Sequence, residues 1–233
     1  MHEIKVGEHW LEHIGPFQVH MDTLLTAWLA MGAIILFAFV VTRKLNIIPD
    51  GLQSLSETLM GFLEGIVQDL MGNKGKKHLP VIASLFLFIL IANLEGQLPW
   101  RLIPFEEGEL ASPTNDINTT LALALIVVIY YFGAGINEKG IGYFKHYFKP
   151  LWFMFPFNLL EDFTRPLSLS LRLFANIVTG ELIILILLSI APVYLFFMPI
   201  PIMLYELFVA FLQAYVFTTL AATYIGSALS EEH

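Results

Sequence analysis

Three side chains in the most apolar third of the chain could carry charge or hold it: Arg172, Asn176 and Glu181. They belong to the segment 161–181, in which Leu, Phe, Ile and Val separate the polar residues. An ionisable side chain at the centre of a membrane helix costs about 2.5–3.5 kcal/mol on insertion scales. Such residues usually face a protein interior or a water-filled cavity, and they often mark an ion path. We therefore expect an ion path here, and we keep the alternative that Arg172 pairs with a buried carboxylate and holds helices together.

The spacing of these residues suits an α-helix, on which successive residues are about 100° apart. Polar residues then form one stripe on an otherwise apolar helix: Arg165, Ser168, Arg172, Asn176 and Thr179. Glu181 lies nine residues after Arg172, about 180° around the same helix. The two charges therefore do not pair with each other. Glu206 and Gln213 likewise share one face of the last apolar stretch, so a carboxylate and an amide stand on that helix too.

The composition places these side chains in a membrane. Of the 233 residues, 57% are apolar and only 14% are charged, well below the roughly 25% of soluble domains. The chain has no cysteine, so disulfides and thiol chemistry are excluded. Its net charge of −8 argues against nucleic acid as a partner. No His/Cys zinc spacing is present, and we expect neither a metal nor another cofactor. We also expect no signal peptide, because no apolar stretch precedes a cleavage site.

The apolar pattern predicts an all-α polytopic membrane protein in a single domain, 1–233, with five membrane-crossing helices and one amphipathic surface helix. The surface helix is expected over 52–71, because apolar residues recur there at helical spacing between Glu57, Glu64 and Asp69. The last two helices exceed the roughly 30 Å of a bilayer core and must tilt or kink, packed antiparallel. The predicted segments are a polar outer arm (1–20), the first span (21–43), the surface helix, a helical hairpin (79–98 and 115–136) and the two long tilted helices (157–190 and 201–229).

The distribution of Lys and Arg predicts the orientation, since these residues concentrate in inner loops. With the N-terminus outside and the C-terminus inside, only Lys5 and Arg101 lie in outer segments. Arg165 and Arg172 lie within a helix. The other eight basic residues then lie inside: Arg43, Lys44, Lys74, Lys76, Lys77, Lys139, Lys145 and Lys149. We therefore predict an N-terminus outside.

Several motifs along the chain resemble one known family. The block 171–176, LRLFAN, followed by Gly180-Glu181-Leu182, is similar to the signature of subunit a of F-type ATP synthases, with Ala175 where Gly is usual. The segments 113–120, PTNDINTT, 158–162, NLLED, and 165–170, RPLSLS, together with the ending 213–226, also resemble bacterial and chloroplast members. The likeness covers nearly the whole chain.

This resemblance implies the stator of a proton-driven rotary motor, in which two half-channels meet a ring of c subunits that each carry a carboxylate. It implies that Arg172 is the essential stator charge. The outer half-channel would be lined by Asn176, Glu181, Glu206 and Gln213, with Asp116 and Asn118 either feeding it or acting as helix caps. The inner half-channel would be lined by Ser168, Glu161 and Asp162. The resemblance leaves open which of Glu181 and Glu206 is the main relay.

The same resemblance implies partners and a location. The partners are the c-subunit ring, b-type peripheral stalk subunits and the lipid bilayer, and the membrane is a bacterial plasma membrane or a thylakoid-type membrane. The chain carries no P-loop, so ATP chemistry would belong to other subunits. Whether the coupled ion is H⁺ or Na⁺ stays open.

Two other classes compete with this interpretation. A secondary transporter or another intramembrane proton-coupled protein would also carry charges in its spans, but transporters often show internal repeats, and we find none between the two halves. An intramembrane hydrolase needs a nucleophile with its base, or a metal cluster. No histidine lies in any predicted span, which disfavours that class.

Overall fold

The computed structural model describes residues 11–14, 17–97, 112–140, 142–143, 152–190 and 199–230. It confirms an all-α polytopic membrane protein: the described residues contain five stretches long and apolar enough to cross a bilayer. The elements in chain order are strands β1 (Leu11–Ile14) and β2 (Phe17–His20), helices α1 (Met21–Thr42) and α2 (Leu52–Met71), the 3₁₀ helix η1 (Gly72–His78), α3 (Leu79–Glu95), the 3₁₀ turn η3 (Pro113–Asn115), α4 (Ile117–Lys139), the 3₁₀ turn η5 (Trp152–Met154), α5 (Phe155–Ile190) and α6 (Pro199–Leu229).

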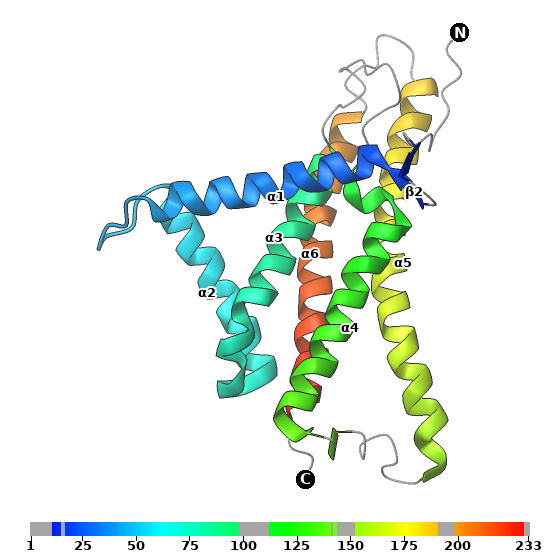
Figure 1. The fold of residues 1–233 in the computed structure, drawn as a ribbon. Helices are drawn as coiled ribbons and strands as arrows, with labels where there is room; N and C mark the ends of the chain where they lie inside the picture. The colour runs from blue at the N-terminus through cyan, green and yellow to red at the C-terminus, as the bar shows by residue number, and fades with distance from the viewer. Residues whose placement is uncertain are drawn as a thin grey trace.

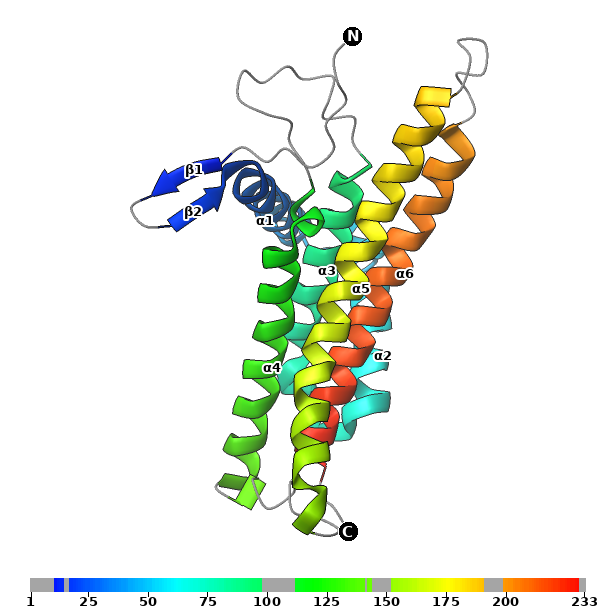
Figure 2. The same ribbon diagram turned by 90° about the vertical axis from the view of Figure 1, so that its right-hand side faces the viewer.

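Helices α3, α4, α5 and α6 run alongside one another as a bundle, and α1 lies across it (Figure 1). Helices α5 and α6 are antiparallel, and they lie side by side in the upper part of the bundle, where α5 ends and α6 begins (Figure 1 and Figure 2). The 22 residues of α1 extend about 33 Å, close to the thickness of a bilayer core, whereas the 36 residues of α5 extend about 54 Å. Because α1 crosses the bundle, the two directions cannot both follow the membrane normal. Helices α5 and α6, of 36 and 31 residues, are both longer than a bilayer core is thick.

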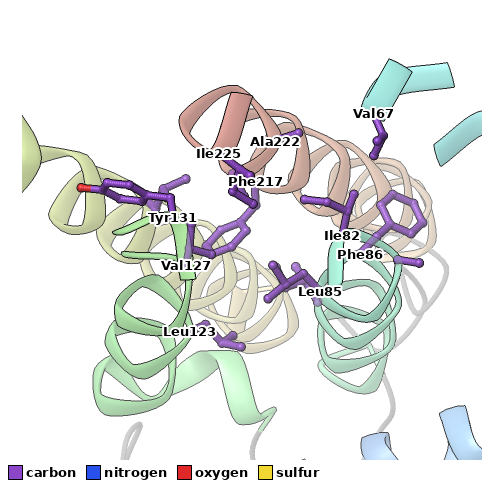
Figure 3. Packing of buried hydrophobic residues seen from close by; sticks show 14 of the residues in the cluster. Val67, Ile82, Leu85, Phe86, Leu123, Val127, Tyr131, Phe217, Ala222 and Ile225 are labelled. Atoms are coloured by element: carbon purple, nitrogen blue, oxygen red, sulfur yellow. The ribbon is translucent and has the colours of Figure 1, made fainter. Parts of the chain in front are cut away.

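The core lies between α3, α4 and α6. Figure 3 shows Phe217 of α6 between Val127 and Tyr131 of α4 and Leu85 of α3, and all four side chains are buried. Small residues of α6 let the neighbouring helices approach it closely: Ala214, Ala221 and Ala222. Lipid tails are as apolar as these side chains, so in a membrane the core is stabilised by close packing rather than by the hydrophobic effect.

Helices α1 and α2 show opposite surface patterns. Most of the apolar side chains of α1 are exposed, including Ile35 and Phe39, which suits a helix surrounded by lipid. In α2, Leu63 and Val67 are buried one turn apart, while the acidic residues Glu57, Glu64 and Asp69 are exposed. The amphipathic pattern thus corresponds to a real division of the α2 surface, with one face on the protein.

The N-terminal arm differs most from what the sequence predicted. Residues 11–20, predicted only as a polar arm, contain the antiparallel pair of β1 and β2, with Leu11 opposite His20. The span predicted to end at 98 instead ends at Glu95, and Gly96 and Gln97 form a turn. Residues 98–111, 144–151 and 191–198 lie outside the described residues. The acidic outer loop, Lys145, Lys149 and Pro192 fall there.

Candidate functional site

The site is built on α5, whose two faces have different chemistry. Leu169, Leu173 and Ile177 follow helical spacing and are buried against the bundle. Ser168, Arg172 and Thr179 lie on the exposed side of the same helix. The apolar stripe thus fixes the rotation of α5 and turns the arginine outward.

Arg172 has no partner within the part of the chain that the structure describes. Its side chain is exposed, and no hydrogen bond or ion pair from a described residue reaches it. Large apolar side chains are exposed around it on α5 and on the neighbouring α6, including Leu171, Phe208 and Leu212. A permanently charged guanidinium therefore stands on an exposed side of the bundle that also carries large apolar side chains.

A cavity of about 160 Å³ lies between α5, α6 and the turn after α3. It has room for several water molecules. Asn176 and Gly180 of α5 line it, one and two turns after Arg172, and Glu206 lines it from α6. The structure therefore brings together two predicted site residues, Asn176 and Glu206, at the end of the bundle where α5 ends and α6 begins.

The carboxyl group of Glu206 has two different environments. Its Oε2 accepts a hydrogen bond from Gln97 Nε2 at 2.8 Å. Its Oε1 is buried and has no hydrogen-bond partner among the described residues. A Cβ added at Gly180 would lie 2.5 Å from this oxygen, so the glycine leaves the space that the carboxyl group occupies. The Glu206 carboxyl group thus lies between Gln97, in the turn after α3, and Gly180 of α5.

Two predicted outer residues lie apart from this contact. Gln213 stands two turns after Glu206 on the same face of α6 and is buried, and its Nε2 has no hydrogen-bond partner among the residues described. Glu181 belongs to α5, immediately after Gly180, but the position of its side chain lies outside the description.

Asp116 and Asn118 form the cap of α4. Asp116 Oδ1 accepts from the Asn118 backbone N–H at 2.8 Å and from Asn118 Nδ2 at 3.0 Å, which satisfies donors at the start of the helix. Asp116 Oδ2 also lies 2.7 Å from His20 Nδ1. The capping alternative is therefore present in the structure, together with a contact to the end of β2.

Both carboxylates predicted for the inner half-channel form hydrogen bonds within the chain. Glu161 accepts from Arg165 at 2.6 Å, and Asp162 accepts from Arg165 at 3.3 Å and from the Tyr131 hydroxyl at 3.0 Å. The Arg165 guanidinium also lies over the ring of Tyr224, 4.9 Å from its centre. This cluster, the Arg165 clasp, joins α4, α5 and α6.

Two neighbouring serines of α5 also differ. Ser168, the predicted inner residue, is exposed. Ser170 is buried, and its hydroxyl lies 3.1 Å from the Thr120 hydroxyl of α4. The exposed serine shares the side of α5 that carries Arg172, whereas the buried one connects two helices.

Gln97, Tyr131 and His20 were not among the predicted site residues. Aromatic residues within apolar helices are usually core residues, so Tyr131 gave no separate signal. Gln97 was detectable in principle, because it is an amide at the end of a predicted span, close to Asn93 and Glu95. Its partner could not be predicted, because the two residues are 109 positions apart.

The fold and the site define a polytopic membrane protein. A long helix carries an arginine that has no partner among the described residues, and a cavity lined by a carboxyl group lies one turn further along that helix. A family model described as "ATP synthase A chain" matches residues 24–226. The chain is 46% identical to "ATP synthase subunit a, chloroplastic" of Stigeoclonium helveticum, covering 99% of this chain and 94% of the relative. It is 44% identical to the protein of that name from Oedogonium cardiacum, covering 99% and 91%. The chain therefore belongs to the ATP synthase A chain family.

Proposed function

We propose that this chain is the stator ion-channel subunit of a rotary ATP synthase. As a family member it takes part in proton translocation in the membrane sector of that complex, alongside other subunits of the sector. In the proposal, two half-channels carry protons to and from the carboxylates of a c-subunit ring. Proton flow across the membrane then drives ring rotation and ATP synthesis. The chain has no nucleotide-binding motif of its own, so ATP is made elsewhere in the complex.

The observation that carries the proposal is that Arg172 is exposed on an apolar surface and has no partner in the part of the chain that the structure describes. Arginine stays protonated in proteins, so it cannot avoid the cost of its charge by losing a proton. An anion must therefore come from outside the described chain, and a ring carboxylate that has just lost its proton is such an anion. A fixed cation that does not titrate also blocks direct proton leakage between the half-channels.

The cavity supports an outer half-channel at Asn176 and Glu206. Water in the cavity would hydrate a carboxyl group that is otherwise costly in a membrane. We place Gln213 and Glu181 on the same path and assign Asp116 and Asn118 to its outer entrance. Each proton that crosses gains about 2.3 kcal/mol per 100 mV of membrane potential.

We assign the inner half-channel to the other end of α5. Ser168 lies one turn before Arg172 on the exposed side. Glu161 and Asp162 would stand at the inner entrance, where the Arg165 clasp holds their charges in place. The inner path would thus reach the ring close to Ser168.

The proposed partners and orientation follow from the same reasoning. The exposed apolar side of α5 and α6 would face the c ring, and b-type stalk subunits would hold the chain against rotation. The N-terminus would lie outside and the C-terminus inside, in a bacterial plasma membrane or a thylakoid-type membrane. An impermeant thiol reagent should label a cysteine at Lys76 only from the inner side, and outer labelling would reverse the orientation.

The direct test is Arg172→Ala in the assembled complex. Alanine removes the anion site, so ATP-driven proton pumping and ATP synthesis should stop, and passive proton leakage should rise because the barrier is gone. Proton flux in vesicles with and without ATP measures both. The complex should still assemble and copurify with its ring. Normal pumping by Arg172→Ala would reject the stator function.

A secondary transporter remains the competing function, and copurification separates the two. A transporter would purify alone or as a homo-oligomer, whereas a stator brings a ring of small hydrophobic subunits. The coupled ion is tested separately. Sodium should protect the ring carboxyl groups from carboxyl-modifying reagents only if the ring binds Na⁺.

A further inference from the structure

The turn after α3 places an amide in the same cavity as Glu206. Gln97 lies in this turn, where its backbone N–H donates to the Leu94 carbonyl at 3.0 Å. Its side chain donates to Glu206 Oε2 at 2.8 Å, and both residues line the cavity. The contact therefore depends on how the end of α3 is held against α6.

A buried polar network holds that end of α3. Asn93 stands one turn before Gln97 and is fully buried. Its Nδ2 reaches the Ala210 carbonyl of α6 at 3.5 Å, and its Oδ1 accepts from the Thr114 hydroxyl at 3.0 Å. Ala210 stands one turn after Glu206. Asn93 and Gln97 thus contact α6 at two successive turns, which fixes where the Gln97 side chain can reach.

The other side-chain oxygens of Gln97 and Glu206 have no hydrogen-bond partner among the described residues. These two atoms, Glu206 Oε1 and Gln97 Oε1, are both buried. The side chain of a glutamate is flexible, and a site that transfers protons works best when its groups are held in one geometry. A donor on Oε2 therefore restricts the carboxyl group and keeps its Oε1 against Gly180.

We propose that Gln97 is a positioning residue of the outer proton path and that it acts through Glu206. This inference rests on the stator function proposed above. A proton delivered along the outer path binds the Glu206 carboxylate and later leaves to the next acceptor, while the Gln97 amide keeps donating to Oε2. Gln97 neither gains nor loses a proton. Its role is to hold the carboxyl group at the wall of the cavity.

The test removes the amide of Gln97 and the carboxyl group of Glu206, singly and together, within the assembled ATP synthase. Gln97→Leu removes the amide and should slow ATP-driven proton pumping by about tenfold, the effect of losing one hydrogen bond to a charged group. Glu206→Gln should also slow pumping. The double variant Gln97→Leu/Glu206→Gln should be no slower than Glu206→Gln alone, because Gln97 acts only through the carboxyl group.

The swapped variant Gln97→Glu/Glu206→Gln is the decisive measurement. It keeps one carboxyl group and one amide in contact in the same cavity and should recover most of the pumping lost in Glu206→Gln. A purely structural role of Gln97 would not produce this recovery. Gln68→Leu makes the same chemical change on the exposed surface of α2 and should leave pumping unchanged.

Two outcomes would overturn the inference. The losses of Gln97→Leu and Glu206→Gln could multiply in the double variant, or the swapped variant could pump as poorly as Glu206→Gln. If Gln97→Leu does not assemble, the swapped variant compared with Glu206→Gln decides alone. Arg172→Ala, measured in the same assay, separates failure of the stator function from failure of the role of Gln97. Normal pumping by Arg172→Ala rejects the stator function. If Arg172→Ala is inactive and the swapped variant does not recover pumping, only the role of Gln97 is rejected.

Discussion

Arg165 donates to Glu161 and Asp162 and lies over the ring of Tyr224, whereas Arg172, about two turns later on α5, is exposed and has no such partner in the described part of the chain. The two side chains are chemically identical, and both stand on a long apolar helix. Their surroundings differ because carboxylates lie three and four residues before Arg165, and none lies within that distance of Arg172.

The comparison separates the two interpretations of an intramembrane arginine. Arg165 fits the interpretation of an arginine that holds helices together. It connects α5 to α4 through Asp162 and Tyr131, and to α6 through Tyr224. Arg172 makes no comparable connection among the described residues, which agrees with the proposal that its anion comes from the c ring. Arg165 therefore connects the helices of the bundle, whereas Arg172 leaves its guanidinium without a partner among the described residues.

Replacing each arginine by lysine should give the largest contrast. Arg172→Lys keeps a charge but loses the planar guanidinium, and lysine can deprotonate, so ATP-driven pumping should stop. Arg165→Lys should keep most of the pumping rate, because a lysine can still pair with Glu161. Acidification of inverted vesicles measures both, with ring copurification as the assembly control. If Arg165→Lys stops pumping and Arg172→Lys does not, the assignment of the two arginines is reversed.

The outer carboxylates should give the next largest effect. Glu206→Gln should slow coupled transport, and the double change with Glu181→Gln should slow it further, because each carboxyl group can serve the outer path. The measurement is ATP synthesis driven by an imposed proton gradient. Normal ATP synthesis in the double variant would show that these carboxylates are structural. The outer path would then have no assigned carboxyl group to bring protons to the ring near Arg172.

Arg165→Ala should lower the stability of the complex rather than stop transport. It leaves Asp162, which is partly buried, without its cation, and we expect a loss of about 2 kcal/mol. Thermal disassembly of the purified complex measures this loss. Arg172→Ala is the matched control and should lower the midpoint less, because Arg172 does not connect helices within the described chain. A lower midpoint for Arg172→Ala but not for Arg165→Ala would contradict the comparison.

The sequence alone predicted much of this fold. A helix was predicted over 52–71, and α2 spans Leu52–Met71. The long helix predicted over 157–190 corresponds to α5, Phe155–Ile190. These predictions work because helical periodicity and long apolar runs are local properties of the chain. The short strands β1 and β2 gave no such signal, since eight residues with mixed polarity carry little periodic information.

The candidate site was predictable residue by residue but not as a set of contacts. Arg172, Asn176 and Glu206 stood out because polar residues are rare in apolar helices. Their neighbours depend on helix packing: nothing in the sequence connects Gln97 to Glu206, or Tyr131 to Asp162. The prediction of Glu161 and Asp162 as path residues also overlooked the i, i+4 and i, i+3 spacing to Arg165, which favours ion pairs on a helix.

The two serines of α5 repeat the comparison on a smaller scale. Ser170 is buried and hydrogen-bonded to Thr120 of α4, whereas Ser168 is exposed on the side of Arg172. Hydrogen bonds between membrane helices average about 0.6 kcal/mol, so Ser170→Ala should lower the stability of the complex by about that amount without slowing pumping. Ser168→Ala should leave stability unchanged and slow pumping modestly, because it removes a polar group from the proposed inner path. Thermal disassembly and vesicle acidification, measured on both variants, test the pair. Slower pumping in Ser170→Ala with normal pumping in Ser168→Ala would move the inner path from the exposed side of α5 to its contact with α4.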